Sequence, residues 1–281
     1  MLRKTTLCFA LLFFAVTLAI AQENTIVEET SKPKAHRIPF YLVGGVPDNK
    51  DASHPVKVLI NEAFVVGYSE ERQNPVWSAY HVDKIENAPE HDRPNIFYTD
   101  LRTEAKVSGE KSFRRQNEPA YDRGHMTPNN AIQEEWGRLA QMETFLMSNI
   151  SPQISALNSG IWKRLEHDIT DRLVKKTDDL WVIAGPIFGN EPATIKDTRI
   201  QIPKSFFMIL LKHHYSGGYS AIAFVFPNNR DDLQNKELEN FLACVSEIES
   251  ATHLDFFTGL GSEEDFDESK KGNFDSWFGE Q

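Results

Sequence analysis

Residues 121–130 read YDRGHMTPNN, and positions 122–125 place an acid, an arginine, a glycine and a histidine in direct succession. The residues that follow, Thr127–Asn130, have the composition of a turn. Arg123 supplies a permanent cation suited to a phosphate oxygen, and Gly124 permits a close approach of the backbone. The stretch therefore combines groups that could act together on a phosphate.

His125 is the candidate general base of this stretch, because a histidine titrates near neutral pH and can accept a proton from water. Asp122 could orient the imidazole or pair with Arg123. A single histidine is more often structural, so four residues alone do not decide the function.

A second stretch, SNISPQISALNSGIWKRLE at residues 148–166, offers oxygen ligands for a metal. Asn158 and Glu166 are eight residues apart, which is about 12 Å along an α-helix. They cannot both bind one ion directly. Asn158 could bind through its amide oxygen and Glu166 through bound water, a ligand set that suits Mg²⁺. Alternatively, Asn158 caps the helix and Glu166 is a solvated acid.

Alternation and apolar runs predict the secondary structure. The predicted strands are residues 56–68, 76–82, 180–187, 206–211 and 219–226, with a hairpin turn at Gly217-Gly218. The predicted helices are residues 133–147, 158–175 and 238–248, the second with a buried stripe of Ile161, Leu165, Ile169 and Leu173. Strands and helices mix without regular alternation, which indicates an α+β fold.

The first 21 residues have the pattern of a secretory signal peptide. Arg3 and Lys4 precede the apolar run Leu7–Ile20, and Ala19-Ile20-Ala21 fits a cleavage site. The run is short for a bilayer span, so an uncleaved anchor is the less favoured alternative. We therefore expect a protein that is secreted or periplasmic, without stable membrane association after cleavage.

Cleavage after Ala21 would remove two of the 30 basic residues and leave 28 against 41 acidic ones, a net charge of −13. This charge argues against coating nucleic acid by bulk attraction, although a local basic cleft remains compatible with it. We divide the rest of the chain into a lead-in (22–55), a folded domain (56–260) and an acidic, flexible tail (261–281). Trp277 and Phe278 are the residues that could attach this tail to the domain.

These motifs together resemble the DNA/RNA non-specific endonuclease family. The resemblance is carried by DRGHM at 122–126, SNISPQ at 148–153, LNSGIW at 157–162 and RLE at 164–166. NPVWSAYHV at 74–82, VIAGPIF at 182–188 and AFVFPN at 223–228 agree with it. Several motifs in the same order make the likeness far more specific than DRGH alone.

The resemblance implies a mixed, largely antiparallel sheet flanked by helices, with a ββα-metal motif at the active site. It assigns the general base to His125, the direct metal ligand to Asn158 and an outer acid to Glu166. Arg123 and the more loosely aligned Arg93 would meet the phosphate, Asn149 would line the site, and Asp122 would position Arg123 or its loop. Arg93 could instead be a surface arginine.

The expected function is metal-dependent hydrolysis of DNA and RNA, with Mg²⁺ or, as an alternative, Mn²⁺ as cofactor and 5′-phosphate ends as products. A non-catalytic nuclease-like module and a phosphodiesterase for small nucleotides are the alternatives. The filled base, arginine, asparagine and glutamate positions argue against the first. The oligomeric state, biological purpose and any inhibitor protein stay open.

Overall fold

The computed structural model describes residues 35–84, 92–109, 113, 121–177, 179–214, 217–229, 233, 236–260 and 267–279. The predicted signal peptide and the first part of the lead-in lie outside these residues. Within the described part of the chain, no helix is both long and apolar enough to cross a membrane.

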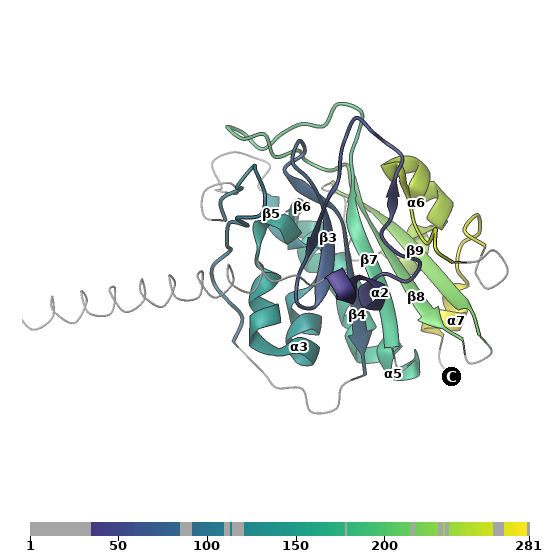
Figure 1. Cartoon of the computed structure of the whole chain (residues 1–281). Helices are drawn as coiled ribbons and strands as arrows, with labels where there is room; N and C mark the ends of the chain where they lie inside the picture. The colour runs from purple at the N-terminus through teal and green to yellow at the C-terminus, as the bar shows by residue number, and fades with distance from the viewer. Residues whose placement is uncertain are drawn as a thin grey trace, which may run out of the picture. The chain divides into compact units, whose positions relative to one another are not determined.

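A seven-stranded sheet forms the centre of the described domain (Figure 1). Every neighbouring pair in it is antiparallel. In spatial order the strands are β10 (Leu242–Ala243), β9 (Tyr219–Pro227), β8 (Ser205–His213), β7 (Asp179–Ile187), β4 (Asn74–Asp83), β3 (Phe64–Ser69) and β2 (Lys57–Ile60). This arrangement confirms the predicted α+β fold with a largely antiparallel sheet.

The sheet is buried on both faces because its central strands are apolar at consecutive positions, and successive side chains point to opposite faces. On β8, Phe206, Met208 and Leu210 belong to one core cluster. Phe207, Ile209 and Leu211 belong to another. The sheet therefore needs a covering layer on each side.

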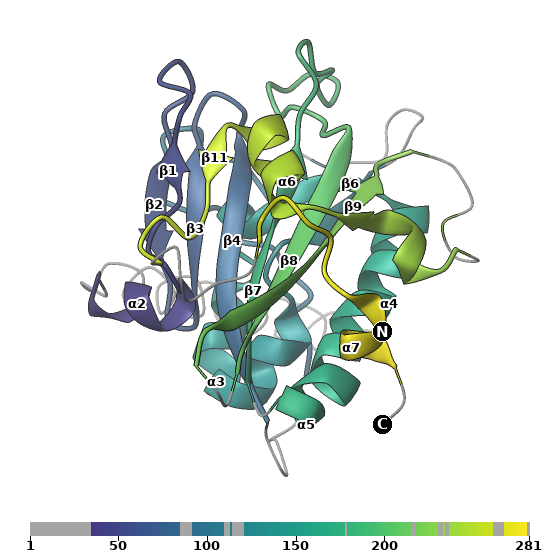
Figure 2. The same cartoon turned by 90° about the vertical axis from the view of Figure 1, so that its right-hand side faces the viewer.

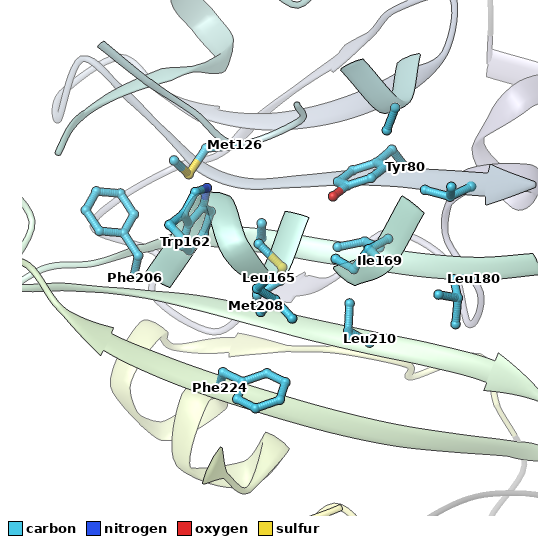
Figure 3. Close-up of a cluster of buried hydrophobic side chains, with 14 of the residues drawn as sticks. Tyr80, Met126, Trp162, Leu165, Ile169, Leu180, Phe206, Met208, Leu210 and Phe224 are labelled. Atoms are coloured by element: carbon cyan, nitrogen blue, oxygen red, sulfur yellow. The ribbon is translucent and has the colours of Figure 1, made fainter. Parts of the chain in front are cut away.

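The first layer is a helical segment made of four consecutive pieces: η3 (Leu157–Ile161), α4 (Trp162–Asp168), η4 (Ile169–Leu173) and α5 (Val174–Thr177). The predicted stripe of Ile161, Leu165, Ile169 and Leu173 is buried, as expected. Figure 3 shows Leu165 and Ile169 directed from this segment towards Met208 and Leu210 on the sheet. Two of the four pieces, η3 and η4, are π-helical turns.

The opposite face is covered by α2 (Ile38–Tyr41), α6 (Val245–Thr252) and the two-stranded ribbon of β1 (Asp48–Asn49) and β11 (Leu254–Asp255). Figures 1 and 2 show α6 on the side of the sheet away from α3 (Asn129–Glu143), α4 and α5. Tyr41 and Leu42 are 1% exposed and belong to this second core. Part of the predicted lead-in is thus part of the folded domain.

Two further predictions differ from the structure. The single strand predicted at 56–68 is a hairpin of β2 and β3, which turns where the Asn61 N–H donates to the Phe64 carbonyl. The helix predicted at 238–248 is divided into η5 (Leu238–Phe241), β10 and α6. Here β10 pairs with β9, so bonding to the sheet edge interrupts the helical pattern.

The tail is also folded where it is described. Residues 267–279 include the short helix α7 (Phe274–Phe278), in which Trp277 is 3% and Phe278 8% exposed. Both side chains join the core cluster under the helical layer. These are the two side chains that could attach the tail to the domain, and their burial stabilises the docked conformation of residues 267–279.

Candidate active site

The DRGH stretch is one strand of a separate β-hairpin. β5 (Tyr121–His125) pairs antiparallel with β6 (Ile150–Ile154), and the helical segment begins shortly after β6. Strand, strand and helix follow one another as the resemblance implies. Gly124 is required where the strands meet, because a Cβ there would lie 2.0 Å from Gln153 Oε1.

A pocket of about 370 Å³ opens between this hairpin, the start of α3 and the helical segment. Five residues predicted for the site line it: Arg93, Arg123, His125, Asn158 and Glu166. They come from three regions of the sequence, and the fold brings them to one cavity. Asp122 adjoins them through Asn158, whose Nδ2 donates to Asp122 Oδ2 over 3.3 Å.

His125 is held in an apolar surrounding. Its ring lies 4.9 Å from Phe145 and 5.4 Å from Phe97, measured between centroids, and the residue is 9% exposed. Burial lowers the pKa of His125 to about 3, with the positive charges of Arg93 and Arg123 contributing in the same direction. The imidazole is therefore neutral at pH 7 and able to accept a proton.

The two arginines are positioned by aromatic rings. Arg123 donates to the Gly109 carbonyl at 2.7 Å and lies 4.1 Å from the Phe97 ring centroid. Arg93 lies 5.4 Å from the centroid of Phe145. Burial lowers the pKa of Arg123, and the nearby charge of Arg93 lowers it further. Two like charges at one pocket make a favourable place for an anion such as a phosphate.

Asn158 and Glu166 could hold a cation in this pocket. Because Asn158 donates through its nitrogen to Asp122, its amide oxygen is the atom left for a cation. Glu166 accepts from Trp162 Nε1 at 2.9 Å, and burial raises the pKa of its carboxyl to about 8. An amide oxygen and a carboxyl that line the same pocket are a donor set that fits a hard divalent ion.

The structure corrects three details of the predicted site. Asp122 contacts Asn158, whereas Arg123 is held by Gly109 and Phe97. Asn158 does not cap the helix, since it lies inside the π-helical turn η3. The rise per residue of a regular α-helix therefore does not apply over the whole stretch from Asn158 to Glu166, because it begins in a π-helical turn.

Asn149 is the third correction. It is 0% exposed, and its side chain is bonded to the Thr127 N–H, the Thr127 carbonyl and the Thr144 carbonyl, each at 2.9 Å. It is not among the residues that line the pocket. Asn149 therefore holds the turn after His125, and the arrangement does not support the predicted contact with substrate.

Sequence reasoning missed several residues at the site. Phe97 and Phe145 enclose His125, and Glu134, Lys163 and Thr170 line the pocket. Lys163 and Thr170 lie three residues before and four after Glu166, so helical spacing could have indicated them. Nothing in the sequence pattern distinguishes Phe97 from an ordinary core residue.

Another group of potential metal ligands occurs among the described residues. One ligand atom each from His81, Asp83 and Asp179 lies within 4.8 Å of the others. None of these three residues lines the pocket of His125. The group is therefore separate from the DRGH hairpin.

Comparisons with known proteins agree with the motifs. The profile of the family described as DNA/RNA non-specific endonuclease matches residues 49–263. The chain is 29% identical to the mitochondrial nuclease EXOG of Danio rerio over 212 residues, covering 70% of this chain and 59% of that protein. It is 27% identical to nuclease C1 of Cunninghamella echinulata over 226 residues, covering 72% of this chain and 83% of that protein.

Human mitochondrial endonuclease G is 30% identical over 152 residues, which are 50% of this chain and 49% of that protein. The chain thus spans only about half to three fifths of the mitochondrial relatives named here. A crystal structure of EndoG in complex with EndoGI has a TM-score of 0.69 at 21% identity, and the match covers 86% of this chain and 99% of that one.

The solved structure supports the fold, and the profile extends over most of the chain, including the DRGH hairpin and the helical segment. Enzymes of this family are metal-dependent phosphodiester hydrolases. The chain belongs to the DNA/RNA non-specific endonuclease family.

Proposed function

We propose that this protein is a metal-dependent endonuclease that hydrolyses DNA and RNA with little preference for sequence or sugar. One observation carries the proposal: a neutral histidine, two arginines, an amide and a buried carboxyl line a single pocket. Each of these groups suits one part of phosphodiester hydrolysis. Membership of the family supports the same reaction.

His125 acts as the general base. It takes a proton from a water molecule whose oxygen attacks phosphorus, and the bond from phosphorus to the 3′ oxygen breaks. The 3′ oxygen leaves and takes up a proton, so the products carry a 5′-phosphate and a 3′-hydroxyl. A positioned general base contributes about 10²–10⁴ in rate.

Arg123 and Arg93 bind the non-bridging phosphate oxygens and stabilise the added negative charge of the transition state. Binding of the phosphate by the two arginines would also change the pKa of His125. Both arginines lower the pKa of the imidazole in the free protein, and a bound phosphate would offset their charges. Substrate binding therefore increases the basicity of His125 at the point where a base is needed.

Asn158, supported by Asp122, is the residue that would hold the divalent ion, with Glu166 reaching it through water. When bound, Mg²⁺ or Mn²⁺ would supply Lewis-acid stabilisation for negative charge at the leaving oxygen. Asp122 contributes by fixing the orientation of the Asn158 amide. The carboxyl of Glu166, whose pKa burial raises to about 8, is mostly protonated at pH 7 in the free protein, and a cation nearby would favour its ionised form.

We also propose that the protein is exported and acts outside the cytoplasm or in a periplasm. The support is the signal-like pattern of residues 1–21. Mass spectrometry of the protein recovered from culture medium or periplasm tests this. A chain beginning at Gln22 is expected, and an intact chain retained in the cell would contradict the proposal.

The proposed activity is tested by incubating the protein with plasmid DNA and with structured RNA, with Mg²⁺ and with excess chelator. We expect both polymers to be cut, loss of cutting in chelator, and products that a 5′-phosphate-dependent exonuclease can degrade. Binding without cutting would favour a nuclease-like module. Hydrolysis restricted to small diesters would favour a phosphodiesterase.

A further inference from the structure

His81 lies near the end of β4, away from the residues that line the DRGH pocket. Its ring is held between Phe40 and Trp181, at centroid distances of 4.7 and 4.8 Å, and the residue is 3% exposed. In Figures 1 and 2 this end of β4 lies beside α3. These two aromatic contacts restrict the orientation of the imidazole.

Two carboxylates face one nitrogen of this ring. His81 Nε2 lies 3.8 Å from Asp83 Oδ1 and 3.7 Å from Asp179 Oδ2. Both distances exceed a hydrogen bond. Strand geometry explains the arrangement, since residues two apart on β4 point to the same face and Asp83 is paired with Asp179 across to β7.

A third carboxylate faces the other nitrogen. His81 Nδ1 is buried without a hydrogen bond and lies 3.9 Å from Glu135 Oε1 on α3. Glu135 is itself fixed, because its Oε2 accepts from the Asp83 N–H at 3.2 Å. A carboxylate behind a histidine is the usual partner that sets the tautomer of a metal ligand.

The surroundings of His81 have a negative charge that no neighbouring cation offsets. Within the described part of the chain, no lysine or arginine forms an ion pair with Asp83, Glu135 or Asp179. A bound cation would offset this negative charge.

We propose that His81 Nε2, Asp83 and Asp179 bind one Zn²⁺ ion, with Glu135 positioning the imidazole. Two ligands of a tetrahedral zinc are about 3.4 Å apart at the usual bond lengths, whereas adjacent ligands of an octahedral Mg²⁺ are about 3.0 Å apart. The 3.7 and 3.8 Å separations exceed both values, so the ligands would move together when an ion binds, by less for zinc than for magnesium. One nitrogen and two oxygens also suit zinc better than magnesium.

The ion can reach this site from solvent. The side chains of Asp83 and Asp179 are 50% and 36% exposed, so water can fill the fourth position. Bound zinc would connect the end of β4 to the start of β7, with α3 held through Glu135. The expected consequence is stabilisation of this end of the central strands β4 and β7, independent of hydrolysis in the DRGH pocket.

Zinc binding is best measured in an Asn158→Ala background, which weakens metal binding in the other pocket. Competition with a chromogenic chelator should detect one Zn²⁺ per chain that raises the melting temperature. Adding Asp83→Asn and Asp179→Asn should weaken this binding by at least about 10-fold, and Glu135→Gln by less. The matched control is Asp48→Asn with Asp255→Asn, a cross-strand aspartate pair without a histidine, which should bind zinc normally.

A spectroscopic measurement on the unaltered protein covers the case in which the variants do not fold. Co²⁺ replacing zinc should give the intense visible absorption of a tetrahedral site with nitrogen and oxygen ligands, reversed by added Zn²⁺. Weak octahedral absorption alone would overturn the proposal. Zinc affinity that is equal in the Asp83/Asp179 variant and the control would also overturn it.

Discussion

The side chain of Asn149 bonds both backbone groups of Thr127. Its Oδ1 accepts from the Thr127 N–H and its Nδ2 donates to the Thr127 carbonyl, each at 2.9 Å. The Asn149 carbonyl also accepts from the Met126 N–H at 3.0 Å. Asn149, which lies directly before β6, thus fixes the chain just after His125. This role explains an asparagine at position 149 without any contact to substrate.

Asn149→Ala should therefore lower the stability of the fold. It should lower the rate of catalysis only indirectly, by changing the position of His125. The change leaves the buried N–H and carbonyl of Thr127 and the Thr144 carbonyl without this partner, at a cost of about 1–3 kcal/mol for each unsatisfied group. We expect a lower urea midpoint and a lower kcat, with KM nearly unchanged. A large increase in KM at unchanged stability would instead support direct substrate contact.

His125→Ala should lower the cleavage rate by about 10²–10⁴, because the attacking water loses its base. Circular dichroism and Mg²⁺ titration should show that the fold and metal binding are retained. His213→Ala, which removes an exposed histidine at the end of β8, is the matched control and should cleave normally. A His125→Ala protein within a few-fold of the parent rate would exclude this residue as the base.

The buried histidine should also make the fold sensitive to acid. Since the folded pKa of His125 is about 3 and its ordinary value is 6.5, the unfolded chain takes up this proton first. The contribution of neutral His125 to the free energy of unfolding is complete above pH 6.5 and is lost as the pH falls towards 3. The loss has a slope of up to about 1.4 kcal/mol per pH unit.

Urea unfolding at pH 7.5, 5.5 and 4.5 tests this effect. The parent protein should lose more stability on acidification than His125→Asn, whereas His213→Asn should follow the parent. Carboxylates titrate equally in all three proteins, so the difference isolates His125. Parallel losses in the parent and His125→Asn would show that the imidazole titrates normally.

The effects on Mg²⁺ binding should differ between the variants of Asn158 and Glu166. Asn158→Ala should weaken Mg²⁺ binding and activity together, because it removes the direct ligand, while Glu166→Ala should weaken both less. Magnesium titrations of activity decide between them. Asp122→Ala should resemble a mild form of Asn158→Ala, since it releases the amide orientation. A greater loss of affinity in Glu166→Ala would reverse the two assignments.

Local sequence patterns predicted the parts of this molecule that depend on local geometry. The buried stripe from Ile161 to Leu173 follows from helical spacing alone, and the strands 180–187 and 219–226 follow from apolar runs between turn residues. Gly217 and Gly218 adopt positive φ angles of 91 and 77°, as the predicted hairpin turn requires.

Contacts between distant residues could not be read from the pattern. Leu242 lies in a helical repeat, yet it pairs with Phe224 because an open sheet edge was available. Asp122 was expected to meet its neighbour Arg123, but the fold brings it to Asn158, 36 positions later. The sequence indicates that Trp277 could attach the tail to the domain. That Trp277 packs in the buried core is visible only in the structure.

Substrate choice is the broadest prediction. The protein should cut DNA and RNA, single- and double-stranded, with little sequence preference. In the proposed mechanism the residues of the pocket act on a phosphate and its attacking water, and phosphate contacts carry no base identity. No groove-reading module such as a zinc finger or basic zipper is recognisable in the sequence.

Salt dependence provides the second part of this test. After cleavage of the signal peptide the chain would carry a net charge of −13, the balance of 28 basic and 41 acidic residues, so long-range attraction to a polyanion should be weak. Binding should still weaken as salt rises, because each neutralised phosphate releases counterions. The slope should correspond to the few cations of the pocket, chiefly Arg93, Arg123 and Lys163. End-sequencing of mixed DNA and RNA digests across a salt series measures both effects, and a fixed sequence at the cut ends or strong discrimination between the sugars would contradict recognition through phosphate alone.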